Sequence, residues 1–99
     1  MLTINRTADN EVTVSQDGRL DIDTAEQLES GLRKALKKTK VLIFDLQNLK
    51  YISSAGLRVL LSAQRQMNRQ GRMRLIHVGE AVMQTLELWG LDEIFNVTE

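Results

Sequence analysis

Residues 41–60 read VLIFDLQNLKYISSAGLRVL, which predicts a buried strand followed by a helix. The first part of this stretch, Val41–Leu46, is apolar except for one aspartate, which is typical of a strand buried on both faces of a sheet. Apolar residues then recur at helical spacing, which predicts an amphipathic helix that ends before Gly71. The inner face of that helix is expected to comprise Leu57, Leu60, Leu61, Gln64 and Met67. Two serines, Ser53 and Ser54, stand where the helix begins.

Ser54 is the predicted cap of this helix. A helix start exposes unpaired backbone N–H groups and the positive end of the macrodipole, so it holds a hydroxyl and tolerates a phosphate. Serine before a helix is in most proteins an ordinary cap that contributes about 1 kcal/mol. Two features favour a further role. The small neighbours Ser53, Ala55 and Gly56 would let another protein approach the backbone, and no Glu or Gln completes a capping box. Ser54 therefore has two interpretations, a cap and a modification switch.

The first forty residues predict a hairpin and a helix. Apolar and polar residues alternate in two runs, which are separated by a turn at residues 7–10. Thr24 is expected to cap the helix, because Gln27 lies three residues on, the spacing of a capping box. The apolar stripe of this helix is Ala25, Leu28, Leu32, Ala35 and Leu36.

The last third predicts a strand, a helix and a short strand. The strand is expected over residues 72–78 and includes His77. The helix is expected over residues 80–89 with Trp89 on its inner face, either in the core or facing a partner. The final strand is expected over residues 94–97. The whole order is β-β-α-β-α-β-α-β. It predicts a single α/β domain over residues 1–99, with three main helices and a mixed, mostly parallel sheet that starts with a hairpin.

Composition excludes several functional classes. Thirteen basic and thirteen acidic residues give zero net charge, which argues against general nucleic-acid binding. The absence of cysteine and the single histidine argue against disulfides, thiolate sites and multi-histidine metal sites. No apolar run approaches the roughly 20 residues that span a bilayer, and the first residues lack a signal-peptide pattern. We therefore expect a cytoplasmic protein that binds neither membranes, metals nor cofactors.

Loops at the carboxyl ends of parallel strands are the usual place for a site. Three loops are expected there, at residues 18–23, 48–54 and 78–80, so Asp21, Asp23, Ser53 and Ser54 should lie near one another.

Enzymatic interpretations of these residues are weaker. A hydrolase would need His77 to reach Ser54, and the chain lacks a Gly-x-Ser-x-Gly elbow and a glycine-rich phosphate loop. Asp21 and Asp23 are expected to be dipole partners of the helix. A carboxylate pair in a small nucleotide-dependent enzyme stays open as an alternative.

Three separated motifs carry a family resemblance. From Val12 to Val97 the chain resembles a STAS domain of the bacterial anti-sigma factor antagonist type. The motifs are Gly18-Arg19-Leu20-Asp21 followed by Thr24-Ala25, Asp45-Leu46 followed by Tyr51-Ile52-Ser53-Ser54-Ala55-Gly56-Leu57, and Gly90-Leu91 followed by Ile94-Phe95. Many members have aspartate where this chain has Ser53.

The resemblance implies a regulatory binding protein and not an enzyme. Such a protein binds an anti-sigma factor, which is a serine kinase of the ATPase type, and so frees a sigma factor for transcription. The kinase phosphorylates the serine that corresponds to Ser54, which dissociates the complex, and a phosphatase reverses this. The partner-binding residues implied are Asp21, Asp23, Thr24, Ser53, Ser54, Ala55, Gly56, Leu57 and Arg58. The alternative is a STAS scaffold or sensor that is not phosphorylated, with self-association left open.

Overall fold

Ten helices and strands follow one another in the computed structural model, which describes residues 1–98. They are β1 (Leu2–Ala8), β2 (Glu11–Gln16), β3 (Gly18–Leu20), α1 (Ile22–Ala35), β4 (Val41–Asp45), β5 (Leu49–Ile52), α2 (Ser54–Gln70), β6 (Arg72–Ile76), α3 (Glu80–Leu88) and β7 (Val97–Thr98). No helix within residues 1–98 combines the length and the apolar character needed to cross a membrane.

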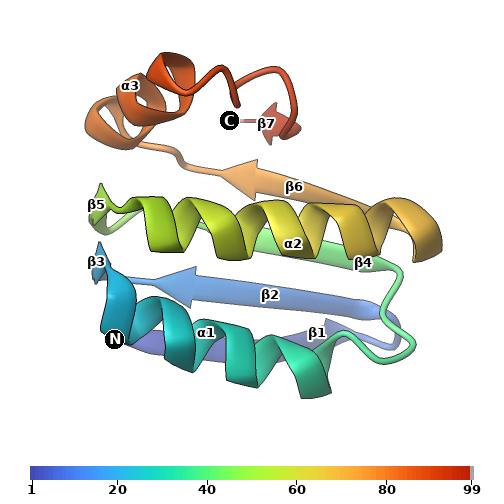
Figure 1. Ribbon diagram of the computed structural model, residues 1–99. Coiled ribbons are helices and arrows are strands. Elements are labelled where there is room, and N and C mark those ends of the chain that lie inside the picture. Colours follow the sequence, from blue (N-terminus) through green and yellow to red (C-terminus); the bar gives the residue numbers. More distant parts are fainter. Residues whose placement is uncertain (99) are drawn as a thin grey trace.

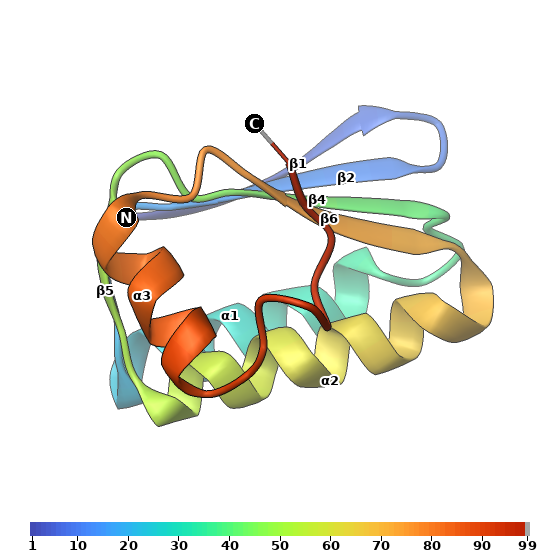
Figure 2. The ribbon, with the colours of Figure 1, turned by 90° about the horizontal axis from the view of Figure 1, so that it is seen from above.

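A five-stranded sheet forms one layer of the molecule. Its strand order is β1-β2-β4-β6-β7, with the hairpin β1–β2 antiparallel and the other neighbours parallel. Helices α1 and α2 run side by side over one face of this sheet, and α3 lies on the same side (Figures 1 and 2). The predicted fold class, a mixed and mostly parallel sheet with an N-terminal hairpin and three main helices, is confirmed.

The core lies between the sheet and the helices. Strand β2 alternates buried and half-buried residues, so Val12 and Val14 point to the helix layer. In β4, Phe44 is fully buried, and even Ile43, which alternates to the opposite face, is only 6% exposed. The predicted stripe of α1 is confirmed, with four of its residues buried and Ala35 half-buried.

A second, two-stranded sheet was not predicted. It pairs β3 with β5 in parallel, in segments that the sequence indicated as loops. Both strands lie at the end of the molecule where α1 and α2 begin (Figure 1). This small sheet therefore connects the two helix starts.

The last third of the chain differs from the prediction in three places. Strand β6 ends at Ile76 because His77 has φ 55°, in the left-handed region, and cannot continue a strand. Helix α3 ends at Leu88, and Trp89 is 60% exposed instead of lying on an inner face. The last strand comprises only Val97 and Thr98, whereas residues 94–97 were predicted. Ile94, which was predicted to belong to this strand, lies outside it and is 53% exposed.

Candidate partner-binding site

The β3–β5 pair brings the starts of α1 and α2 together through one carbonyl group. The oxygen of Leu20, the last residue of β3, accepts a hydrogen bond from the Ser53 backbone N–H at 2.9 Å. It also accepts one from the Ser53 hydroxyl at 3.0 Å. Asp21 follows Leu20 directly, so for two of the three predicted loops, residues 18–23 and 48–54, the proximity is confirmed.

Ser53, and not Ser54, caps helix α2. Its backbone is extended, with φ −92° and ψ 173°, and its hydroxyl oxygen accepts the Gly56 N–H at 3.3 Å. The prediction that Ser54 is the cap was wrong by one residue. The tertiary bonds to Leu20 decide this position, because they hold Ser53 outside the helix.

Ser54 is instead the first residue of α2 and is exposed. Within residues 1–98 its hydroxyl makes no hydrogen bond, whereas the Ser53 hydroxyl makes two. The cap and the accessible hydroxyl therefore belong to two different residues. A change at Ser54 can leave the cap of the helix intact.

Gly56 is required by the close approach of α2 to the small sheet. A Cβ at this position would lie 2.7 Å from the Cγ of Leu20, 2.9 Å from its carbonyl oxygen and 2.9 Å from the Cγ1 of Ile52. The first of these distances is far below ordinary van der Waals contact. The absence of a side chain at Gly56 thus lets the first turn of α2 lie against β3.

Asp21 caps helix α1, and the prediction of Thr24 as the cap was wrong. The Asp21 carboxylate accepts the backbone N–H groups of Asp23 and Thr24, each at 3.1 Å. The Thr24 hydroxyl in return accepts the Asp21 N–H at 2.8 Å. These reciprocal bonds form a capping box between Asp21 and Thr24. The helix cap therefore lies three residues before the predicted cap, Thr24.

The same bonds favour the ionised form of Asp21. The Thr24 backbone N–H holds the pKa of Asp21 below its usual value, with smaller contributions in the same direction from the Thr24 hydroxyl, the Asp23 N–H and Arg19. Arg19 lies 3.7 Å from the carboxylate and stacks over the Tyr51 ring at 4.5 Å. Asp21 is thus an ionised helix cap. Within residues 1–98 no group of three or more His, Cys, Asp or Glu side chains could hold a metal ion.

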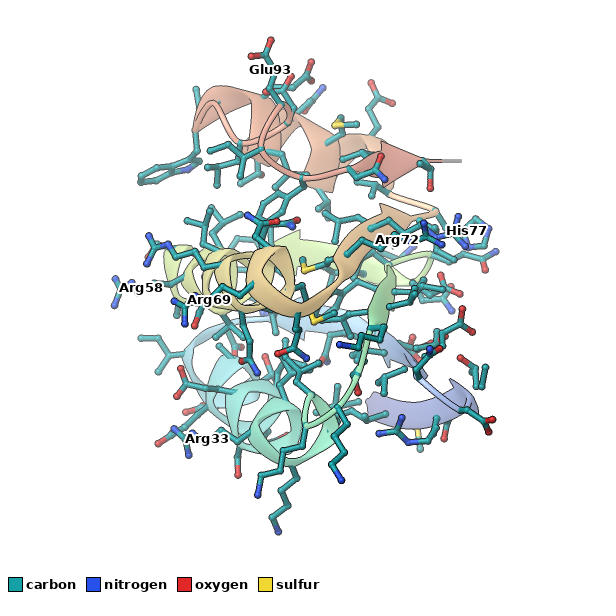
Figure 3. All side chains as sticks on the ribbon, turned by 90° about the vertical axis from the view of Figure 1, so that its right-hand side faces the viewer. Arg33, Arg58, Arg69, Arg72, His77 and Glu93 are labelled. Carbon is teal, nitrogen blue, oxygen red and sulfur yellow. The ribbon has the colours of Figure 1, made fainter. Side chains whose placement is uncertain are left out.

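The predicted site residues lie at different depths. Ser54, Asp23 and Arg58 are exposed, and Asp21, Thr24, Ser53 and Ala55 are half-buried. Gly56 and Leu57 are buried, so they pack beneath the exposed residues and are not part of the surface itself. Arg58 points outward on the helix side, whereas His77 lies on the opposite side of the molecule (Figure 3). There the Nδ1 atom of His77 lies 3.0 Å from the Asp45 carboxylate, so no Ser54–His77 pair forms.

Two exposed apolar side chains lie beside these residues. Ile22, at the start of α1, is 72% exposed, and Trp89, after α3, is 60% exposed. Ile22 borders the groove between α1 and α2 together with Ala55 and Arg58. Trp89 borders a groove that also contains Ser54 and Arg58. The sequence-based prediction left Ile22 outside the apolar stripe of α1 and did not choose between a buried and a partner-facing Trp89.

This arrangement has close counterparts among known proteins. A family model described as the STAS domain matches residues 3–99. The chain is 38% identical over 82 residues to BtrV of Bordetella bronchiseptica, which is named as an anti-sigma factor antagonist, and the match covers 81% of this chain and 71% of BtrV.

The fold is shared with solved structures of the anti-sigma factor antagonist SpoIIAA. Its unphosphorylated form matches with a TM-score of 0.87 and 19% identity over 100% of this chain and 89% of SpoIIAA. The phosphorylated form, from Bacillus, matches with a TM-score of 0.80 and 18% identity over 100% of this chain and 92% of the other. Together with the BtrV match, the family match shows that the chain belongs to the STAS domain family of anti-sigma factor antagonists.

Proposed function

We propose that this protein binds an anti-sigma factor that is a serine kinase, and that phosphorylation of Ser54 by this kinase dissociates the complex. Binding frees a sigma factor for transcription in the cytoplasm, and a phosphatase restores the binding form. The names of BtrV and SpoIIAA support the antagonist role. The observation that carries the assignment of Ser54 is its exposed hydroxyl, which makes no hydrogen bond within residues 1–98 while Ser53 caps the helix.

A phosphate on Ser54 is compatible with the fold. It adds about −1.5 to −2 charges at neutral pH. At the first residue of α2 these charges lie at the positive end of the helix dipole, so they do not oppose the helix. SpoIIAA has been solved in both forms, and both resemble this chain along its whole length. This supports a switch that acts on the interface and leaves the fold in place.

The same charge is unfavourable in a protein interface. Burying it against a surface shaped for a neutral hydroxyl costs several kcal/mol unless a cation pairs with it, by the usual range of about 3–5 kcal/mol for an uncompensated buried charge. A loss of about 1.4 kcal/mol already lowers affinity tenfold. Phosphorylation can thus dissociate the complex without unfolding either protein.

The phosphorylation experiment uses the two adjacent serines as a matched pair. The chain is incubated with its anti-sigma factor kinase and ATP, and the products are mapped by mass spectrometry. We expect one phosphate on the wild type and on Ser53→Ala, and none on Ser54→Ala. A phosphate on Ser53, or none with the wild type, contradicts the assignment.

The binding experiment separates the switch from the alternative scaffold function. Ser54→Asp should weaken binding to the kinase at least about tenfold while circular dichroism and thermal unfolding stay unchanged. Ser54→Ala should bind as the wild type does. Equal binding by all three proteins would instead support a scaffold or sensor that is not phosphorylated. Turnover of ATP by the isolated chain, abolished by Asp21→Asn, would contradict the non-enzymatic role.

A further inference from the structure

The groove between α2 and the end of α3 combines an exposed aromatic ring with an apolar floor. It is lined by Ser54, Leu57, Arg58, Leu61, Trp89 and Leu91. Leu57 and Leu91 are buried, whereas Trp89 is 60% exposed at the rim. A large aromatic side chain next to a hollow is the kind of residue that dominates the binding energy of protein interfaces.

Arg58 gives this groove its charge. Among the lining residues, all within the described part of the chain, it is the only one that is ionised at neutral pH. The ion pairs within residues 1–98 do not include Arg58. Its side chain points away from the sheet on the helix side of the molecule (Figure 3). The complementary ligand is therefore an apolar side chain with a carboxylate beside it.

The groove is continuous with the surface around Ser54. Ser54 itself lines it, and Arg58 lines both this groove and the one between α1 and α2. The exposed apolar residues Trp89 and Ile22 therefore border the two grooves that meet at Arg58.

We propose that the groove is the anchoring point of the anti-sigma factor kinase. An apolar side chain of the kinase packs against Trp89, and a neighbouring carboxylate of the kinase pairs with Arg58. The inference rests on the proposed function and adds to it the chemistry of the contact and a residue outside the family motif.

Arg58 also explains how a phosphate would act at this site. Ser54 and Arg58 are four residues apart on α2, so their side chains lie on the same face of the helix. A phosphate on Ser54 carries about −1.5 to −2 charges, so pairing with Arg58 in the same chain neutralises only part of this charge and also takes Arg58 away from the carboxylate of the kinase. The phosphate also places negative charge beside that carboxylate, so attraction becomes repulsion.

The test compares two neighbouring exposed residues by calorimetric titration with the kinase. Trp89 and Leu88 are both exposed, at 60% and 84%, but only Trp89 lines the groove. Trp89→Ala should weaken binding at least about 30-fold, as a hot-spot residue does, and Leu88→Ala by less than about twofold. Arg58→Ala should weaken binding and reduce its dependence on salt. Urea unfolding of each variant checks that the fold is intact.

A second measurement does not depend on substitution. Trp89 is the only tryptophan, so 5-fluorotryptophan gives a single ¹⁹F resonance at this position. We expect this resonance to shift, and the solvent exposure of the Trp89 ring to fall, when the kinase is added.

The outcomes separate the two proposals. If the wild type does not bind the kinase, the proposed function and this inference both fail. If the wild type binds but Trp89→Ala binds equally well, or the ¹⁹F resonance stays unchanged in the complex, only the inference fails. A dimer of the isolated chain that Trp89→Ala converts to a monomer would assign the groove to a second copy and overturn the inference.

Discussion

Replacing Gly56 with alanine tests whether the contact between α2 and β3 holds the site in place. A methyl group at position 56 would meet the Cγ of Leu20 at 2.7 Å and the Leu20 carbonyl oxygen at 2.9 Å. The oxygen belongs to the backbone of β3 and cannot rotate away. Relief therefore requires α2 to move away from β3, which lengthens the two hydrogen bonds from Ser53 to the same oxygen.

The expected loss of stability follows from three contributions. Overpacking of a rigid contact costs about 1–3 kcal/mol. Each weakened hydrogen bond of Ser53 contributes up to about 0.5–1.5 kcal/mol. Alanine in place of glycine within a helix raises the stability by about 1 kcal/mol, which offsets part of this loss. We expect Gly56→Ala to lower the free energy of unfolding by about 2 kcal/mol, which for about 100 residues lowers Tm by roughly 10 °C.

Gly31→Ala is the matched control, since Gly31 also lies inside a helix. There the added methyl would meet the Cδ1 of Ile4 at 2.5 Å, the far end of a flexible side chain that can turn away. We expect Gly31→Ala to range from neutral to about 1 kcal/mol more stable. Urea unfolding followed by circular dichroism measures both. Equal stability of Gly56→Ala and the wild type, or equal losses in the two variants, would show that the contact between α2 and β3 does not hold the site in place.

The remaining predictions concern the caps and the tryptophan. Ser53→Ala should lower the free energy of unfolding by about 1–2 kcal/mol, because it removes a cap and a tertiary hydrogen bond. Ser54→Ala should change it by less than about 0.5 kcal/mol. Urea unfolding measures both, and a larger loss for Ser54→Ala would contradict the assignment of the cap. The lowered pKa of Asp21 stabilises the fold above about pH 4, the usual range of aspartate, and this contribution is lost as the pH falls through the lower folded value. Urea unfolding from pH 7 to pH 2 should therefore show the stability advantage of the wild type over Asp21→Asn shrinking at low pH; a difference independent of pH would rule this out. Because Trp89 is 60% exposed, its fluorescence maximum should move little on unfolding; a large red shift would mean that the ring is buried.

The regular parts of the fold could be predicted because their signals are local. The apolar run of β4 and the helical stripes of α1 and α2 repeat over many residues, so each segment indicates its own structure. The strands β3 and β5 are only three and four residues long, too short for a periodic pattern. They exist because they pair with each other, which no local pattern could reveal.

The helix caps also depend on contacts that a local sequence pattern does not contain. Ser53 and Ser54 are chemically identical, so a local pattern cannot choose between them. The Leu20 carbonyl, 33 residues away in the chain from Ser53, makes the choice. The position of Trp89 was left open for a related reason. Its apolar character fits both burial and a partner-facing position, and the helix that ends at Leu88 leaves the ring at the surface.

From the residue pattern we could predict the α/β class, the order of the main elements, the likeness to STAS domains and the region of the candidate site. These features depend on periodicity and on motifs that are contiguous in the chain. The packed structure was needed to establish that Ser53 is the cap, that Ser54 carries the accessible hydroxyl, and that Trp89 and Arg58 share a groove with Ser54. Those features depend on contacts between segments distant in sequence, whose geometry is set when the β3–β5 pair and the helix layer pack together.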